Sequence, residues 1–290
     1  MKFQTFSIVV GNEACNAKCN FCIARMTPGI VPADCEFSGK RFINACRLAE
    51  KCDVTTALLT GKGEPTLFPD HLKAYIDKAA DYFPLIELQT NGLDFLKRDI
   101  FWRHQFSREY IGLTTVALSI VHYEDNRNRE IYCDKGSDVR GPYPPLRDTI
   151  NFLQDCGLSV RLNCIGLKGY IDTAAKVGEL LTFARNCGHE IQVTWRPVDM
   201  PDKTRSDAVA EETRKLLVAD KDEQEIHKCV RDVGTLLLKL PHGAEVYDVD
   251  GQNLCLTNCL TRQPDDIIRQ LIYADGRLRY DWTYKGALIL

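Results

Sequence analysis

Hydrophobic residues follow two alternating spacings along the first 200 residues of the chain. Short runs rich in β-branched and aromatic residues recur six times, and stretches with apolar residues at helical spacing follow several of them. Strands that alternate with helices predict a parallel sheet built through right-handed crossovers. The predicted strands cover residues 3–10, 54–60, 85–90, 115–121, 159–165 and 191–198. The predicted helices begin after Ser38 and cover residues 69–80, 146–156 and 173–187.

Polar residues in the last two predicted strands distinguish two forms of such a sheet. Arg161 and Asn163 share one face of the fifth strand. Gln192, Thr194 and Arg196 share one face of the sixth. An open, doubly wound sheet is covered by helices on both sides and would have two apolar faces. We therefore predict a partial (β/α)6 barrel with a polar interior, and a solvated edge strand is the alternative explanation.

The pattern changes after residue 200. Residues 206–218 and 223–240 have charged, amphipathic helical patterns, and residues 122–145 are predicted to be a long, charged loop. Asp250-Gly251 and Asp275-Gly276 each lie between strand-like runs, and such dipeptides favour tight hairpins. We predict a barrel over residues 1–200, a helical segment packed on it over 201–243, and a β-rich extension over 244–290.

Composition excludes some classes of protein. The 290 residues are 44% hydrophobic, and the net charge of −3 does not indicate a nucleic-acid or membrane surface. The first residues lack the apolar core of a signal peptide, and no run is long enough to span a bilayer. The 13 cysteines, an odd number, argue against a disulfide framework. These features predict a cytoplasmic protein.

Three cysteines form the most informative cluster in the sequence. Cys15, Cys19 and Cys22 lie within eight residues, directly after the first predicted strand. Thiolates are soft ligands that suit iron–sulfur clusters and zinc, and a cubane cluster normally takes four of them. The run therefore predicts a cluster with one iron open to another ligand. Part of a zinc site, or a coincidence in a cysteine-rich chain, are the alternatives.

Further candidate residues lie at or near the C-terminal ends of the predicted strands. In a β/α barrel these ends converge on the ligand. Glycines allow the backbone to approach a ligand closely, and a carboxylate accepts hydrogen bonds from an ammonium group. An ordinary tight turn is the alternative for the glycine-rich segment. The candidates are Gly61-Lys62-Gly63-Glu64-Pro65 after the second strand, Thr90-Asn91-Gly92 at the end of the third, and Ser119, Asn163 and Arg196 in the next three.

Together, the CxxxCxxC spacing and the Gly-x-Gly-Glu-Pro segment resemble the hallmarks of the radical S-adenosylmethionine (radical SAM) superfamily. The resemblance covers residues 1 to about 200 and implies a partial (β/α)6 barrel. It also implies a 4Fe–4S cluster on Cys15, Cys19 and Cys22, with SAM bound at the open iron. Lys62 stands where the commoner motif has glycine, although Gly-x-Gly-Glu-Pro variants also look like family members.

The resemblance implies roles for individual residues. Phe21 packs near the adenine of SAM, and Gly61, Gly63 and Glu64 hold its ammonium group. The remaining contacts to carboxylate and ribose fall to Thr90, Asn91, Ser119, Asn163 and Arg196, and Arg196 could equally bind the substrate.

The implied activity is reductive cleavage of SAM to a 5′-deoxyadenosyl radical that abstracts a hydrogen atom from a substrate. The cofactors carry this chemistry, and the protein orients them and excludes water. An external one-electron reductant of the flavodoxin or ferredoxin type is the implied partner.

Residues 164–169 resemble the corresponding strand of the GTP 3′,8-cyclases of molybdenum cofactor synthesis. Those enzymes carry a second cluster on three C-terminal cysteines, whereas this chain has Cys255 and Cys259 there. The two cysteines either join a second cluster with another residue or are buried thiols on a hairpin.

Charged residues after the fourth, fifth and sixth strands favour a polar or anionic small molecule, such as a nucleotide or sugar phosphate. They are residues 123–130, Lys168, Lys203 and Arg205, and a solvated charged surface is the alternative. His122 is a candidate general base or an ordinary loop histidine. The alternative functions are a peptide-modifying maturase or glycyl-radical activase, and a non-catalytic metal-binding module.

Overall fold

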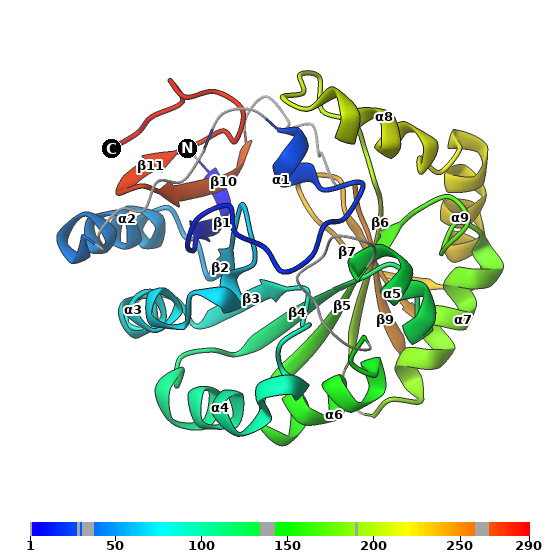
Figure 1. Cartoon of the computed structure of the whole chain (residues 1–290). Helices are drawn as coiled ribbons and strands as arrows, with labels where there is room; N and C mark the ends of the chain where they lie inside the picture. The colour runs from blue at the N-terminus through cyan, green and yellow to red at the C-terminus, as the bar shows by residue number, and fades with distance from the viewer. Residues whose placement is uncertain (1, 28–29, 31–37, 134–142, 189–190, 259–266) are drawn as a thin grey trace.

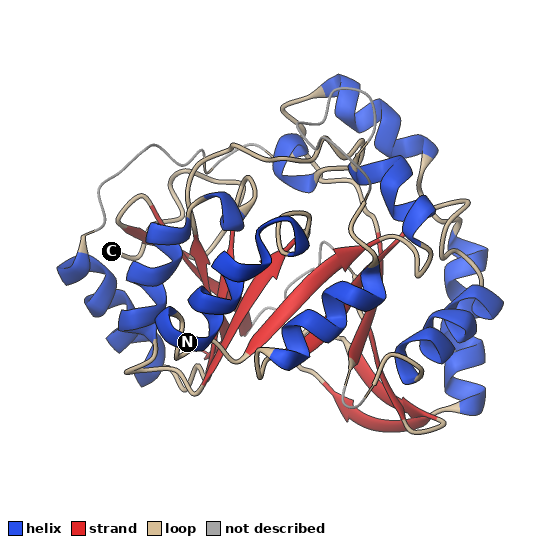
Figure 2. Cartoon of the chain, turned by 60° about the horizontal axis from the view of Figure 1, so that its bottom comes forward, coloured by secondary structure: helices blue, strands red, loops and turns tan. Residues whose placement is uncertain are grey.

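The computed structural model describes residues 2–27, 30, 38–133, 143–188, 191–258 and 267–290. These residues form a large, mainly parallel sheet, with most of the helices around its outer side (Figure 1). In the turned view of Figure 2 the strands splay across the molecule and the helices lie along its periphery.

The strands are β1 (Lys2–Val9), β2 (Thr56–Thr60), β3 (Leu85–Thr90), β4 (Thr115–Ile120), β5 (Ser159–Gly166), β6 (Gln192–Pro197), β7 (Thr235–Lys239), β8 (Glu245–Val249), β9 (Gln252–Leu256), β10 (Ile267–Ala274) and β11 (Arg277–Arg279). The α-helices are α1 (Ile23–Met26), α2 (Gly39–Lys51), α3 (Pro69–Ala79), α4 (Asp99–His104), α5 (Asp125–Tyr132), α6 (Leu146–Asp155), α7 (Ala174–Arg185), α8 (Asp207–Lys215) and α9 (Asp220–Val233). Shorter turns are η1 (Pro65–Leu67), η2 (Leu96–Arg98) and the π-helix η3 (Gln105–Glu109).

The parallel centre of the sheet confirms the α/β prediction. Strands β1 to β6 lie in chain order, and each pairs in parallel with the next. Their bounds lie within two residues of those predicted from the sequence. Because the carboxyl ends of parallel strands meet at one edge, the segments after β1, β2 and β3 come together there.

Apolar and polar side chains alternate along these strands, so that the sheet has an apolar outer face and a polar inner face. Ile8, Leu59 and Leu88 belong to the buried core that the strands share with the outer helices. In α2 the fully buried Phe42 packs on Phe6, with 6.0 Å between the ring centroids. Such aromatic pairs add to the free energy of burial itself.

The polar inner face predicted from the fifth and sixth strands is present. Arg161 Nη1 lies 2.6 Å from Glu87 Oε2 on β3, and Arg161 Nε donates to Gln192 Oε1 on β6 at 3.0 Å. The Glu87 side chain is only 5% exposed, so its ion pair with Arg161 offsets the cost of burying a carboxylate. Polar groups of three strands therefore meet on this face.

The C-terminal strands extend the sheet at both edges. Strand β9 pairs in parallel with β6, and β10 pairs in parallel with β1. Both predicted hairpins are confirmed, β8–β9 at Asp250-Gly251 and β10–β11 at Asp275-Gly276. All four turn residues have positive φ, as a type I′ turn requires.

Two sequence predictions outside the parallel strands were wrong. The predicted loop over residues 122–145 contains the helix α5, whose buried residues are Asn128, Ile131 and Tyr132. The helix predicted over residues 223–240 ends at Val233, and Thr235–Lys239 is the edge strand β7. Gly234 separates the two, because glycine is a poor helix former.

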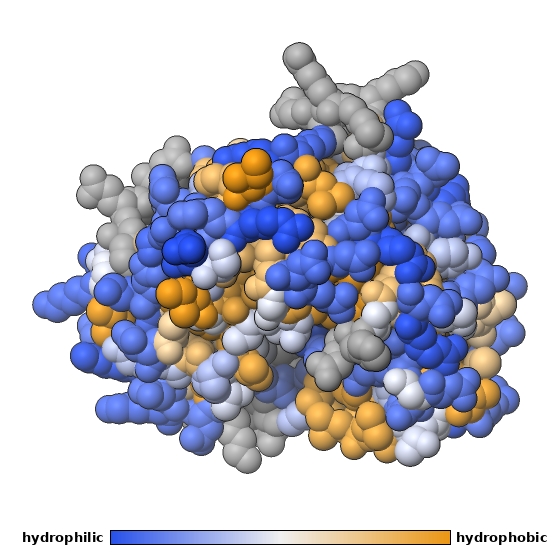
Figure 3. Space-filling view, turned by 90° about the horizontal axis from the view of Figure 1, so that it is seen from below, coloured by the Kyte–Doolittle hydropathy of each residue, from blue (hydrophilic) through white to orange (hydrophobic). Residues whose placement is uncertain are grey.

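The surface in Figure 3 is mostly hydrophilic, with apolar residues gathered in several separate places. Within the part of the chain that the structure describes, no helix has the length and apolar character to cross a bilayer.

Candidate active site

The cysteine loop follows β1 and ends where α1 begins, and it is the dark blue stretch between them in Figure 1. Cys22 is the N-cap residue of α1, and its amide donates to Cys19 O at 3.3 Å. The Ala17 amide lies 3.4 Å from Cys15 Sγ. All three thiols are free and partly buried. The backbone thus holds the three cysteines in one short, turned segment.

The electrostatics of the loop show that these thiols influence one another. Burial raises the pKa of Cys15 to about 12, and the nearby Cys22 adds to the rise. Burial also raises the pKa of Cys19, again with contributions from Cys22 and Cys15. The raised pKa values favour the protonated thiols. A bound metal would instead favour the thiolates, because coordinating thiols lose their protons.

The loop after β2 lies directly against the cysteine loop. The Glu64 amide donates to Ala14 O at 2.9 Å. A Cβ atom at Gly63 would lie 2.0 Å from Ala14 O, which is closer than real Cβ contacts allow. Glycine at this position therefore permits the two loops to approach one another.

Glu64 is the centre of a buried hydrogen-bond network at the ends of β2 and β3. Its Oε1 accepts from Thr66 N at 3.1 Å, Thr66 Oγ1 at 2.8 Å and Thr90 Oγ1 at 2.6 Å. Its Oε2 accepts from Asn91 N at 3.0 Å. Burial raises the pKa of this carboxyl group, while the hydrogen bonds from Thr90, Asn91 and Thr66 oppose that rise.

Asn91 carries the network back to the cysteine loop. Its Nδ2 donates to Asn16 Oδ1 at 2.7 Å, and its Oδ1 accepts from the Leu93 amide at 3.0 Å. Asn16 lies between Cys15 and Cys19. The structure thus brings together the cysteine loop, Glu64, Thr90 and Asn91, three segments that are far apart in the sequence.

The other predicted strand residues form a row on the inner face. Ser119 is paired with Asn163, Asn163 with Thr194, and Thr194 with Cys255. Residues paired across parallel strands point to the same face of a sheet. Cys255 therefore shares the inner face with Ser119 and Asn163. The prediction for Cys259 falls outside the described residues.

An apolar cluster adjoins the cysteine loop and includes the buried side chain of Tyr132. Phe21 packs there with Val121, Ile165 and Tyr132, and Cys15 and Cys19 border the cluster. Within the described chain, Tyr132 Oη and Arg196 Nε have no hydrogen-bond partner. Such buried groups are uncommon in proteins and call for an explanation.

Tyr132 is not among the site residues predicted from the sequence, because residues 122–145 were expected to form a loop. The available signal was the spacing of Asn128, Ile131 and Tyr132, at i, i+3 and i+4 of a short charged helix. Ile131 and Tyr132 are its only large apolar residues, so the amphipathic pattern was too short to stand out.

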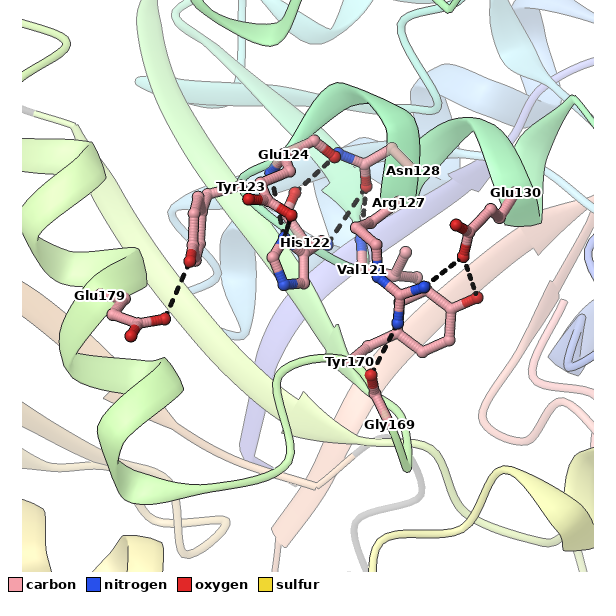
Figure 4. Close-up of polar contacts among 10 residues, drawn as sticks. All are labelled: Val121, His122, Tyr123, Glu124, Arg127, Asn128, Glu130, Gly169, Tyr170 and Glu179. Carbon is pink, nitrogen blue, oxygen red and sulfur yellow. Dashed lines mark hydrogen bonds and ion pairs between the residues drawn. The ribbon is translucent and has the colours of Figure 1, made fainter.

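His122 lies in the turn that begins α5 (Figure 4). Its Nδ1 accepts a hydrogen bond from Glu124 N at 3.1 Å, and Asn128 Oδ1 accepts from its backbone amide. Burial lowers the pKa of the imidazole and favours its neutral form. These contacts stabilise the turn, and a catalytic role for His122 stays a prediction.

The charged residues expected to meet a substrate are largely engaged elsewhere. Arg127 pairs with Glu130, donates to Gly169 O and lies over the ring of Tyr170 (Figure 4). Arg205 pairs with Glu13. Their use by a substrate stays a prediction.

No protein-family model matches the chain, and no curated protein matches it. Solved structures do share its fold. Native anSMEcpe with bound AdoMet aligns with a TM-score of 0.54 and 14% identity, over 79% of this chain and 59% of that one. HydG, a maturase of the FeFe-hydrogenase, aligns with a TM-score of 0.54 and 11% identity, over 79% and 50%. A radical SAM methyltransferase from Sphaerobacter thermophilus aligns with a TM-score of 0.50 and 17% identity, over 95% and 70%.

The chain has the fold of the radical SAM enzymes. The resemblance inferred from the two motifs is confirmed at this level. The chain covers less than two thirds of the length of anSMEcpe and HydG.

The donor set fits the iron–sulfur cluster that the radical SAM fold family implies. Among the described residues, no three His, Cys, Asp or Glu side chains converge as the ligands of a single metal ion do. In a cubane cluster each thiolate binds its own iron, so the three cysteines need to surround it rather than meet at one point. Three thiolates from one loop suit that softer, larger group.

Proposed function

We propose that the chain is a radical SAM enzyme that acts on a polar small molecule. The proposal depends chiefly on one observation, the close packing of the cysteine loop against the Gly63–Glu64 backbone. This contact joins the two sequence motifs in a chain with the radical SAM fold. The same proposal treats residues 1–200 as a partial (β/α)6 barrel, 201–243 as a segment packed on it and 244–290 as an extension.

Cys15, Cys19 and Cys22 would hold a 4Fe–4S cluster, and SAM would bind beside it. When bound, these cofactors supply one-electron cleavage of SAM to a 5′-deoxyadenosyl radical that takes a hydrogen atom from the substrate. The chain provides the binding site and the shielding from water. An odd number of cysteines and an oxygen-sensitive cluster fit the reducing cytoplasm, where a flavodoxin or ferredoxin would supply the electron.

Glu64 is suited to receive the ammonium group of SAM through Oε2. That oxygen accepts one hydrogen bond, whereas Oε1 accepts three. A carboxylate oxygen has a second lone pair for a further donor. Gly61 and Gly63 keep the backbone close to the same place, and Phe21 offers an apolar surface to the adenine.

Further contacts would come from the inner face and from the end of β3. Thr90 and Asn91 are held in place by Glu64. Ser119 and Asn163 stand side by side on β4 and β5, where they could bind ribose hydroxyls or the carboxylate. Arg196 belongs to the next strand along the same face.

The two unpartnered buried atoms favour a ligand with an anionic or polar group. Tyr132 is 3% exposed, and Cys19 and Arg196 both contribute electrostatically to the pKa of its hydroxyl. A phenol and a guanidinium both donate hydrogen bonds, so a carboxylate or phosphate satisfies both. This supports a polar metabolite as substrate, of the nucleotide or sugar-phosphate kind.

The experiment that tests the function is anaerobic incubation of reconstituted protein with dithionite and SAM. We expect release of 5′-deoxyadenosine, accelerated by the true substrate in a screen of phosphorylated and carboxylated metabolites. Protein that binds neither iron nor sulfide, and does not cleave SAM, would exclude the proposal. Acceleration by a peptide or partner protein alone would instead support a maturase or activase.

Replacing Tyr132 by phenylalanine tests the ligand contact. We expect weaker binding of the accelerating metabolite by about tenfold, equivalent to roughly 1.4 kcal/mol, with the cluster content unchanged. Titration calorimetry with that metabolite measures the change. As the matched control, Tyr143→Phe alters the neighbouring ring, whose centroid lies 6.3 Å away. Equal affinity of the Tyr132 variant and the wild type would refute the contact.

A further inference from the structure

Lys62 is the residue at which the loop after β2 departs from the commoner family motif, and its side chain is buried. Only 5% of the residue is exposed. Its Nζ donates a 2.8 Å hydrogen bond to Thr27 Oγ1. The hydroxyl of Thr27 in turn donates to Ile23 O in α1, also at 2.8 Å. Because α1 begins directly after Cys22, the ammonium lies against the short helix that follows the third cysteine.

Of the two neighbouring positive charges, Arg205 and Lys62, only Arg205 forms an ion pair among the described residues. Arg205 forms an ion pair with Glu13 and donates to Ala24 O at 3.0 Å, so its own charge is compensated. Lys62 forms no ion pair with a carboxylate anywhere in the described chain, and its one side-chain hydrogen bond goes to the neutral Thr27. Burial, with a smaller contribution from Arg205, lowers the pKa of Lys62 to about 8, and Glu13 and Cys22 oppose this change.

A buried ammonium without an anionic partner is costly to the folded protein. The missing anion is supplied if the three cysteines ionise to bind a cluster. A 4Fe–4S cube on three thiolates carries a net negative charge, and reduction by one electron makes it more negative. A fixed positive charge nearby stabilises the reduced form more than the oxidised form.

We propose that Lys62 is the positive counter-charge of the iron–sulfur cluster and raises its reduction potential. The inference rests on the proposed function, since it needs a cluster on Cys15, Cys19 and Cys22. Thr27 fixes the position of the ammonium through its hydrogen bond. The external reductant supplies the electron, and Lys62 makes the reduced cluster easier to form.

The test compares three replacements of Lys62 in reconstituted protein without SAM. Methionine and glutamine remove the charge, and arginine retains it. In an EPR-monitored redox titration we expect K62M and K62Q to disfavour reduction by about tenfold, which equals a midpoint lower by about 59 mV for one electron. K62R is expected to stay within about threefold of the wild type.

The unfolding temperature of the metal-free protein distinguishes Lys62 as a counter-charge of the cluster from Lys62 as a residue that only stabilises the fold. An apolar side chain of similar size removes the desolvation cost of an unpaired buried charge. We therefore expect metal-free K62M to unfold at the wild-type temperature or above it. A merely structural lysine would lower that temperature and leave the midpoint potential unchanged.

The midpoint potential and the iron content of the variants also test the inference. An unchanged midpoint in the neutral variants at full iron content, or an equal shift in K62R, overturns the inference. If the neutral variants do not load iron and K62R does, the counter-charge is supported, whereas failure of all three overturns it. Wild-type protein that holds no cluster overturns the proposed function itself.

Discussion

Replacing Cys19 by alanine is expected to abolish cluster binding and the release of 5′-deoxyadenosine. Cys19 lies between the other two cysteines, and its partly buried thiol interacts electrostatically with both. Without it the loop offers two thiolates to a cluster that needs three from the protein. Iron and sulfide analysis, visible absorbance and detection of 5′-deoxyadenosine measure the loss.

Cys229→Ala is the matched control for this prediction. Cys229 is exposed on α9 and outside the cysteine loop, so both cluster content and SAM cleavage should remain at wild-type levels. A C19A protein that keeps its iron and its cleavage activity would exclude Cys19 as a ligand. Iron content also tests the second-cluster alternative for Cys255, because a second cube would double it.

The parallel centre of the fold was predictable because its physical signal is local. In β1 and β2 the outward residues Phe6, Ile8, Ala57 and Leu59 are apolar and fully buried, and the residues between them are more polar or less buried. Gly11 and Gly61 mark the ends of these two strands. The cysteine and glycine motifs were found for the same reason, since each is continuous in the sequence.

The contacts that assemble the site were not predictable, because they join distant segments. The Asn91–Asn16 hydrogen bond joins residues 75 positions apart, and nothing in the sequence around either asparagine identifies the other as its partner. The position of β10 beside β1 likewise depends on pairing between the two ends of the chain. Leu236–Leu238 suit a helix or a strand equally by hydrophobicity, and pairing with β8 decides the outcome.

Glu64→Ala is expected to be the most destabilising of the single replacements considered. The wild-type carboxylate accepts four hydrogen bonds, from two groups of Thr66, from Thr90 and from the Asn91 amide. Alanine leaves these buried donors without an acceptor, at roughly 1–3 kcal/mol for each one that finds no other partner. We expect the free energy of unfolding to fall by roughly 3–5 kcal/mol. Urea unfolding of the metal-free protein measures it.

Thr66→Val is the matched control for the network. It removes one hydroxyl donor and keeps the carboxylate, the Thr66 amide, Thr90 and Asn91, so a loss of about 1–2 kcal/mol is expected. An E64A protein as stable as the wild type would show that the network does not stabilise the fold. If that stable protein also failed to bind SAM, the carboxylate would act on the ligand alone. Combined loss of stability and of iron loading would show that Glu64 holds the cysteine loop in place through Asn91 and Asn16.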